Sequence, residues 1–344
     1  MKAVILETIN APLVIHEVEL MPLQFGQVLV KILVSGICGS QLHEIAGNKG
    51  NAKFVPHLLG HEGCGIVEAV GVGVSRVKPG DKVIMHWRKG DGIESDFPSY
   101  MYKGKIIRSG KVTTLSEYSV VSENRITPVP HETPNELCAL LGCSLSTALG
   151  LIDNESELKL GESFMTMGVG GLGVNLIKAA HLAGAHPIIA VDIHDHKKET
   201  ALEVGADLYV NARTHSVREE IEKHLGIKDV HVIVDCTGAK QAIEDSIQLL
   251  SGIGRFVMLG HPKPGETVEL KNANHFFEGE GKSLRATQGG RFHPSRDIPR
   301  YVGLHKTGKL NIDKIITHRL RLDQINEAID LVRNGHASRI LIEM

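Results

Sequence analysis

The chain has 344 residues, of which 42% are hydrophobic, and this length predicts two domains rather than one ordinary core. Its formal net charge of −2 argues against binding to nucleic acid and against a polybasic membrane contact. The first apolar run is too short for a signal peptide, and no stretch reaches the roughly 18 to 20 apolar residues of a membrane helix. We therefore expect a cytoplasmic protein with no membrane contact.

The first 150 residues or so are predicted to be mainly β. The branched run at 28–34 is typical of a strand, and 63–70 predicts another. A Pro-Gly-Asp turn within 77–84 precedes a third strand. Because turns are frequent and helical periods are few, this part of the chain is expected to form a barrel-like β domain.

The hydrophobic period changes between about residues 160 and 260. Strands are expected to alternate with helices, which predicts an α/β fold with a doubly wound parallel sheet. The predicted strands are 164–167, 187–191, 230–234 and 255–259, and the predicted helices are 172–182, 197–204 and 242–250. Further on, 322–328 is expected to be helical and 340–342 to form a closing strand.

A glycine-rich loop follows the strand predicted at 164–167. Residues 168–173 match G-x-G-x-x-G between a strand and a helix, which is the context that a dinucleotide-binding loop requires. Asp192 ends the next strand, where a carboxylate accepts hydrogen bonds from an adenosine ribose and repels a 2′-phosphate, so NAD is expected rather than NADP. Lys197 either adds charge near that ribose or is a solvated helix lysine. The loop residues predicted to bind the cofactor are Gly168, Gly170, Gly171 and Gly173.

Five cysteines spread over a long chain do not make a disulfide framework. Cys38 follows a predicted strand, His61 stands between glycines, and Cys143 precedes the nucleotide domain. Two thiolates and an imidazole are ligands that a catalytic zinc accepts while it keeps one open position. A buried cysteine is also an ordinary small core residue, so the residues alone leave both interpretations open.

Taken together, these motifs make the chain resemble the zinc-dependent medium-chain dehydrogenases/reductases, the alcohol dehydrogenase superfamily. The motifs that carry the resemblance come in the order and at the spacing of the family, and they extend to Ser338 and Arg339. The resemblance implies a β-rich GroES-like catalytic domain at 1–150, an NAD-binding Rossmann domain at 151–285, and a return to the catalytic domain at 286–344. The motifs lie at 36–40, 60–65, 78–83, 141–143 and 168–173.

The resemblance also implies roles for single residues. Cys38, His61 and Cys143 would be the zinc ligands, with Glu62 beside the metal. Ser40 would hydrogen-bond the substrate hydroxyl, and His43 would end a proton relay that passes through Ser40 and the cofactor ribose. Arg339 would lie near the cofactor pyrophosphate. The alternatives are a surface histidine at His43 and an ion-pair partner at Arg339.

Two departures from the family pattern bear on the metal. Many relatives carry an aspartate where this chain has Gln41, and that aspartate orients the zinc-bound histidine; an amide oxygen accepts the same N–H without the charge. Many relatives also hold a structural zinc with four cysteines, but residues 85–120 contain no cysteine. We therefore predict one catalytic zinc per chain and no four-cysteine zinc.

The segment 86–95 is distinctive because it holds the one tryptophan, Trp87, near where relatives line the substrate pocket. Arg88 and Lys89 indicate either an anionic substrate or a solvated loop around a core tryptophan.

The expected activity is hydride transfer between a primary or secondary alcohol, a small molecule, and NAD. A polyol, sugar or threonine-type dehydrogenase is the alternative, and a non-catalytic relative is a remote one. We expect a homodimer or homotetramer, with the strand at 255–259 as the sheet edge.

Overall fold

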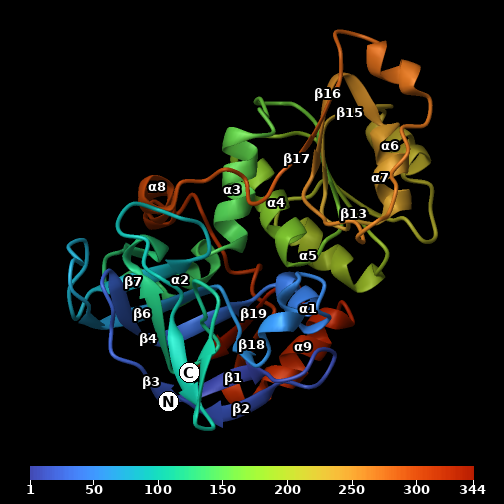
Figure 1. The fold of residues 1–344 in the computed structure, drawn as a ribbon. Coiled ribbons are helices and arrows are strands. Elements are labelled where there is room, and N and C mark those ends of the chain that lie inside the picture. Colours follow the sequence, from blue (N-terminus) through green and yellow to red (C-terminus); the bar gives the residue numbers. More distant parts are fainter. The chain divides into compact units, whose positions relative to one another are not determined.

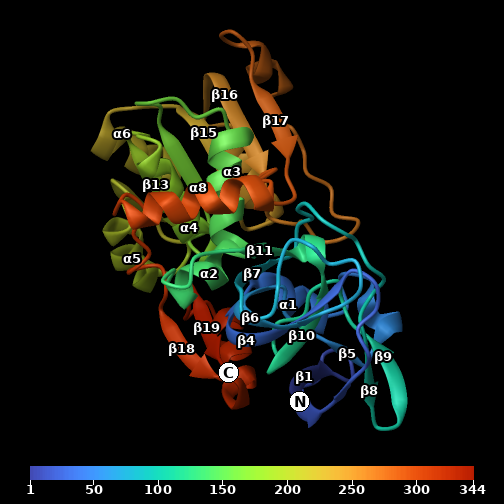
Figure 2. The same cartoon turned by 90° about the vertical axis from the view of Figure 1, so that its left-hand side faces the viewer.

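The structure is a computed structural model that describes residues 1–344, apart from the side chains of residues 51 and 52. The chain divides into two compact units. Unit 1 comprises residues 1–146, 293–312 and 316–344, and unit 2 comprises residues 147–292 and 313–315. Figures 1 and 2 give two views of the ribbon, coloured along the chain.

Unit 1 is rich in strands. Its strands are β1 (Lys2–Leu6), β2 (Val14–Glu17), β3 (Glu19–Leu20), β4 (Gln27–Ile37), β5 (His57–Leu58), β6 (Glu62–Val70), β7 (Lys82–His86), β8 (Ser99–Tyr102), β9 (Lys105–Arg108), β10 (Tyr118–Ser122), β11 (Ile126–Pro128), β18 (His318–Arg321) and β19 (Ile340–Glu343). The largest sheet runs β11-β7-β6-β4-β19-β18, with β10 also paired to β4, and two smaller sheets run β2-β1-β5 and β3-β8-β9.

The helices of unit 1 are short or lie near its ends. They are α1 (Gly39–Ile45), η1 (Asn51–Phe54), η2 (Glu123–Arg125), α2 (Asn135–Leu141), α8 (Pro294–Lys306), η5 (Leu322–Gln324) and α9 (Ile325–Arg333). Helix α3 (Ser144–Asn154) begins in unit 1 and continues into unit 2.

Strand β4 organises the sheet that carries the candidate site. Its residues Val28, Val30 and Ile32 alternate with more exposed positions and belong to one buried cluster, as expected of a strand with one face on the core. The C-terminal strand β19 pairs antiparallel with the end of β4, so that Ile340 lies opposite Ile37. Residues from the two ends of the chain therefore meet at the end of β4.

Unit 2 is a parallel sheet flanked by helices. Its elements are β12 (Phe164–Met167), α4 (Gly171–Leu182), β13 (Ile188–Asp192), η3 (Asp195–Lys197), α5 (Lys198–Glu203), β14 (Leu208–Asn211), α6 (Val217–Leu225), β15 (Val230–Asp235), α7 (Lys240–Ile247), β16 (Leu250–Met258), η4 (Ala273–Phe277) and β17 (Ser283–Ala286).

All neighbours in this sheet are parallel, and their order is β14-β13-β12-β15-β16-β17. The chain passes from β12 through α4 to β13 and on to β14, returns through α6 to β15 on the other side of β12, and continues through α7 to β16. Helices α4 and α7 therefore cover opposite faces of the sheet, as Figure 1 shows. The carboxyl ends of β12 and β13, where the glycine loop and Asp192 lie, meet at one edge of the sheet.

The predicted β-rich first part and the predicted doubly wound parallel sheet are confirmed. Helix α8 was not predicted, because Pro299 stands inside it and proline usually interrupts a helix. The helix predicted at 242–250 is wrong at its end, since α7 stops at Ile247 and Leu250 opens β16.

The expectation that 255–259 forms the sheet edge is wrong. Strand β16 lies between β15 and β17, and the edge strands of this sheet are β14 and β17. The short sequence of β17, Ser-Leu-Arg-Ala, has too weak a β signal to be recognised as a further strand.

Among the described residues, no single helix is long and apolar enough to cross a membrane. The pair α2 and α3, bent by 55°, passes the same test of length and composition when the two are taken together.

Candidate functional site

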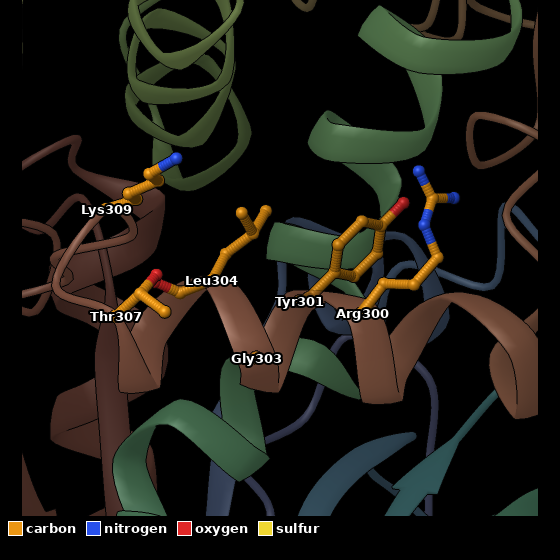
Figure 3. Close-up of a pocket in the computed structure, with 6 residues that line it drawn as sticks. All are labelled: Arg300, Tyr301, Gly303, Leu304, Thr307 and Lys309. Atoms are coloured by element: carbon orange, nitrogen blue, oxygen red, sulfur yellow. The ribbon is translucent and has the colours of Figure 1, made fainter.

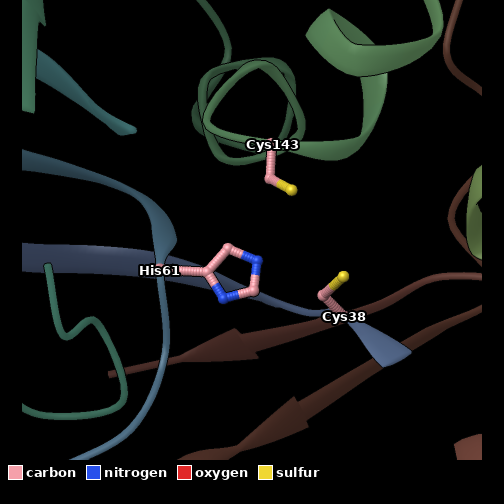
Figure 4. A group of neighbouring side chains, drawn as sticks. All are labelled: Cys38, His61 and Cys143. Carbon is pink, nitrogen blue, oxygen red and sulfur yellow. The ribbon is translucent and has the colours of Figure 1, made fainter. Parts of the chain in front are cut away.

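Three predicted ligands meet in unit 1. Cys38 follows β4 as the N-cap of α1, His61 directly precedes β6, and Cys143 lies between α2 and α3. Their candidate ligand atoms all lie within 4.8 Å of one another. Figure 4 shows the two sulfurs and one ring nitrogen of His61 directed toward a common space. Three residues far apart in the sequence thus form one donor group of two sulfurs and a nitrogen.

The approach of the Cys143 loop depends on Gly142. A Cβ atom at this position would lie 2.4 Å from the carbonyl oxygen of Met85 and 2.8 Å from the Cβ of Glu62. No side chain fits at that separation, so glycine is what allows the loop to rest against β6 and β7.

The electrostatics of the group favour a thiolate at Cys38. A hydrogen bond from the Cys143 thiol lowers the pKa of Cys38 well below its usual range, with further help from His61 and Arg339. Since the shared proton stays on Cys143, that hydrogen bond and burial raise the pKa of Cys143. A cation held by both sulfurs would displace this proton, because the metal ligand is the thiolate.

Glu62 and Arg339 form a buried ion pair behind the donor group. The two side chains are 0% and 2% exposed, and Arg339 Nη2 donates to Glu62 Oε1. Arg339 Nη1 also donates to the carbonyl oxygen of Ile37 at 2.9 Å, and Glu62 Oε2 accepts from the backbone N–H of Ser144 at 3.2 Å. The pair therefore ties the residues that precede Cys38 and follow Cys143 to one another.

Gln41 contacts both a ligand side chain and a ligand backbone. Its Oε1 accepts from the backbone N–H of Cys38 at 2.8 Å, and its Nε2 lies 2.8 Å from His61 Nδ1. The side chain is fully buried. Because Oε1 is directed at the Cys38 N–H, the amide nitrogen faces the imidazole, unlike the arrangement expected from the sequence.

The predicted proton-relay residues lie on α1. Ser40 Oγ is 3.4 Å from His61 Nδ1, which places the hydroxyl beside the donor group. His43 lies one turn further along α1, and its side chain is exposed. Ser40 is thus near the candidate metal position, whereas His43 lies on the solvent side of the same helix.

The charged side chains of the 86–95 segment form ion pairs within the protein. Lys89 Nζ lies 3.5 Å from Glu94 Oε2, and Glu94 also pairs with Arg125 and Lys111 at 3.1 and 3.3 Å. Burial raises the pKa of Glu94, but the hydrogen bond from Asn124 and the contacts with Arg125 and Lys111 outweigh it and lower that pKa to about 2. The charge of Lys89 is therefore balanced within the protein.

Trp87 directly follows β7, the strand that pairs with β6. The antiparallel ladder of these strands ends at the Glu62–His86 pair, so His61 and Trp87 both lie directly beyond that end of the ladder. The guanidinium of Arg88 stacks on the Trp87 ring at 5.4 Å.

His86 gives the segment a pH dependence. Its Nδ1 donates to the carbonyl oxygen of Arg88 and its Nε2 accepts from Thr127, and burial lowers its pKa from 6.5 to about 4. Since the unfolded chain binds this proton first, stability should fall as the pH drops from about 6.5 to 4, by up to about 3 kcal/mol. Urea unfolding at pH 7 and pH 4.5 measures the loss, and His86→Gln should show about 2 kcal/mol less of it. Equal losses in the two proteins would contradict the assignment.

The glycine loop of unit 2 has the predicted geometry. Gly168 follows β12, and Gly170 caps α4, which begins at Gly171. A Cβ atom at Gly173 would lie 1.9 Å from the carbonyl oxygen of Gly168, so only glycine lets the helix start fold back on the loop. Backbone N–H groups at the start of this 12-residue helix are available to an anion.

Asp192 and Lys197 lie together at the end of β13. Lys197 Nζ is 3.1 Å from Asp192 Oδ2, and both side chains are buried. Although burial acts in the opposite direction, the charge of Lys197 and the donated hydrogen bonds lower the pKa of Asp192. The alternative of a solvated helix lysine at Lys197 is therefore wrong.

Sequence reasoning missed His194, which donates to the same carboxylate. Its Nδ1 lies 3.0 Å from Asp192 Oδ1. The only available signal was its place two residues beyond the predicted ribose-binding acid.

Two surface hollows are lined by residues other than the predicted site residues. One of about 410 Å³ runs along α8, and Figure 3 shows the Arg300, Tyr301 and Leu304 side chains that line it together with Gly303, Thr307 and Lys309. None of the predicted site residues is among them. A second, more open hollow of about 370 Å³ is lined by residues of η3 and α5.

A β-rich unit with a Cys-His-Cys group and a parallel-sheet unit with a glycine loop are together typical of a metal-dependent oxidoreductase. Residues 24–131 match the family "Alcohol dehydrogenase GroES-like domain", and residues 171–307 match "Zinc-binding dehydrogenase". The chain belongs to the zinc-dependent medium-chain dehydrogenase superfamily, and it is an enzyme of the alcohol dehydrogenase class. The predicted family and fold class are thereby confirmed.

Full-length relatives agree with this assignment. The chain is 30% identical to alcohol dehydrogenase 2 of Zea mays over 97% of its own length and 94% of the relative. Among solved structures it is similar to benzyl alcohol dehydrogenase of Acinetobacter calcoaceticus, with 25% identity and a TM-score of 0.89 over 100% of this chain and 99% of that one. A zinc-binding dehydrogenase of Sinorhizobium meliloti bound to NADP has 26% identity and a TM-score of 0.81, over 100% of this chain and 99% of that one.

Proposed function

We propose that the enzyme transfers a hydride between a primary or secondary alcohol and NAD, with one catalytic zinc held by Cys38, His61 and Cys143. The observation that carries the proposal is the approach of two sulfurs and a ring nitrogen to within 4.8 Å of one another. This donor set suits zinc, which accepts thiolate and imidazole ligands and keeps a fourth position open in catalytic sites.

Zinc would supply Lewis-acid polarisation of the alcohol or carbonyl oxygen, and NAD would accept the hydride. The residues of the chain position the reactants around that chemistry. Ser40, whose hydroxyl lies beside His61, would hydrogen-bond the substrate hydroxyl and receive its proton. His43, exposed on the same helix, would pass that proton to solvent. Glu62, which pairs with Arg339 next to the ligand residues, would adjust the net charge near the zinc.

The cofactor is proposed to bind unit 2 through its pyrophosphate and adenosine ribose. The glycine loop and the start of α4 would take the pyrophosphate, and Asp192 with Lys197 would lie at the ribose. A carboxylate at this position favours NAD. The resemblance also assigns Arg339 to the pyrophosphate, but its bonds to Glu62 and Ile37 favour a role in balancing the charge of Glu62.

The test is a screen for NAD reduction with zinc content measured on the same sample. The substrates are simple alcohols, polyols, hydroxy-amino acids and sugar phosphates, which separate the alcohol activity from the polyol, sugar and threonine-type alternatives. We expect about one zinc per chain, as the three-ligand open site implies. Activity that survives complete zinc removal, or no NADH with any substrate, would sink the proposal.

Gln41 provides a prediction about zinc affinity. A carboxylate at this position has enough acceptor sites for both the Cys38 N–H and the His61 Nδ1–H. We therefore expect Gln41→Glu to bind zinc about tenfold more tightly, the range typical of groups that orient a metal-bound histidine. Competition with a chromophoric chelator measures this affinity, and weaker binding by the variant would contradict the role assigned to Gln41.

The association state and the location of the protein remain predictions. A homodimer or homotetramer would use an edge of the parallel sheet, which is β14 or β17 rather than the strand expected from the sequence.

A further inference from the structure

The carboxylate of Asp192 is already fully occupied by donors of its own loop. Oδ2 accepts from the backbone N–H of Val169 at 2.7 Å and from Lys197 Nζ at 3.1 Å. Oδ1 accepts from the backbone N–H groups of Ile193 and His194 at 2.8 and 3.2 Å, and from His194 Nδ1 at 3.0 Å. A carboxylate offers about four lone-pair sites, which these five donors already share, so a ribose hydroxyl can bind only in exchange for one of them.

One of the five donors is the best placed to leave. Three are backbone groups fixed by the fold, and Lys197 has a side chain only 10% exposed, so its release would strand a buried charge. The imidazole of His194 is 33% exposed and can turn toward solvent at little cost. A ribose hydroxyl would therefore bind Oδ1 in exchange for the His194 imidazole, and the number of donors to the carboxylate would stay the same.

Lys197 also compensates the negative charge of the Asp192 carboxylate. Lys197 lies on one of its oxygens, so the pair presents about zero net charge to an incoming group, and repulsion of a 2′-phosphate is weaker than from a free aspartate. A displaced imidazole beside the 2′ position would in addition offer an N–H to phosphate oxygens.

We propose that His194 is a cofactor-selectivity residue that leaves Asp192 when the adenosine ribose binds and donates to the 2′-phosphate of NADP, so that the enzyme accepts NADP as well as NAD. This inference rests on the dinucleotide binding proposed above. The enzyme would still bind NAD more tightly than NADP, as the sequence predicts from Asp192, but the ratio of the two affinities would be smaller.

The test measures binding rather than turnover. Dissociation constants for NADH and NADPH are obtained from nucleotide fluorescence with the zinc-containing enzyme and with His194→Ala. We expect wild-type binding of NADPH to be within about a hundredfold of NADH, and the variant to lose about tenfold in NADPH affinity, as for one charge-assisted hydrogen bond. NADH affinity should change less than about threefold, because Asp192 keeps its remaining contacts.

His196→Ala is the matched control. This second imidazole lies in η3, on the same loop, with its ring centre 5.5 Å from that of His194, so the variant removes a side chain of the same kind from the same neighbourhood. It should leave the ratio of the two affinities unchanged. The inference is overturned if wild-type enzyme binds NADH but not NADPH, if His194→Ala changes both affinities in parallel or neither, or if only His196→Ala lowers NADPH affinity. Failure to bind either nucleotide would instead reject the proposed function.

Discussion

Replacing Cys38 with serine is expected to remove zinc and activity together. The variant loses a thiolate ligand whose pKa the neighbouring Cys143, His61 and Arg339 hold low, and an alcohol oxygen is a much weaker ligand for zinc at neutral pH. Lewis-acid activation lowers the reaction barrier by several kcal/mol, so without zinc turnover should fall by about a thousandfold or more. Metal analysis and steady-state rates on the same preparation measure both effects.

Cys64→Ala is the control for this experiment. Cys64 is also a buried cysteine of unit 1, three residues beyond His61, but it lies outside the Cys38–His61–Cys143 group. The control should keep its zinc and lose only the modest stability that a small core thiol contributes. Wild-type turnover in zinc-free Cys38→Ser protein would show that these sulfurs do not hold a catalytic metal.

Local signals in the sequence account for the nucleotide loop. The strand, the glycines and Asp192 lie within a short span, where period and spacing fix their relation, so the arrangement of residues 164–192 follows from the sequence alone. The donor group is different, because Cys38, His61 and Cys143 come together only through the packing of β4, β6 and α2. Spacing alone left a core cysteine equally acceptable, and the resemblance to a family was needed to join the three.

Neither local sequence signals nor the resemblance to a family could predict the individual side-chain contacts. The sequence indicated that Gln41 would accept from His61, yet its oxygen is directed at the backbone N–H of Cys38 and its nitrogen at His61. It indicated that the Asp192 carboxylate would accept from an adenosine ribose, yet neighbouring donors already occupy both of its oxygens. In each case a nearby donor competes for the same acceptor, and such competition depends on rotamers rather than on pattern.

Replacing Arg339 with methionine should destabilise the protein by about 3–5 kcal/mol, because the carboxylate of Glu62 would remain buried without its partner. Both side chains are almost wholly inaccessible to solvent, and burial already raises the pKa of Glu62 against the influence of Arg339. Urea unfolding of the zinc-containing enzyme at pH 7 measures the change. The double variant Arg339→Met/Glu62→Gln removes both charges and should recover much of the loss.

Arg333→Met is the matched control, since Arg333 pairs with Asp330 on the exposed surface of α9 and should contribute less than about 1 kcal/mol. The same variants decide between the two roles considered for Arg339. If its purpose were to hold the cofactor pyrophosphate, Arg339→Met would unfold at nearly the wild-type urea concentration without nucleotide, and its NADH affinity would fall. If it balances Glu62, stability falls without nucleotide and Glu62→Gln restores it, because the cost arises from an unpaired buried charge that is present before any cofactor binds.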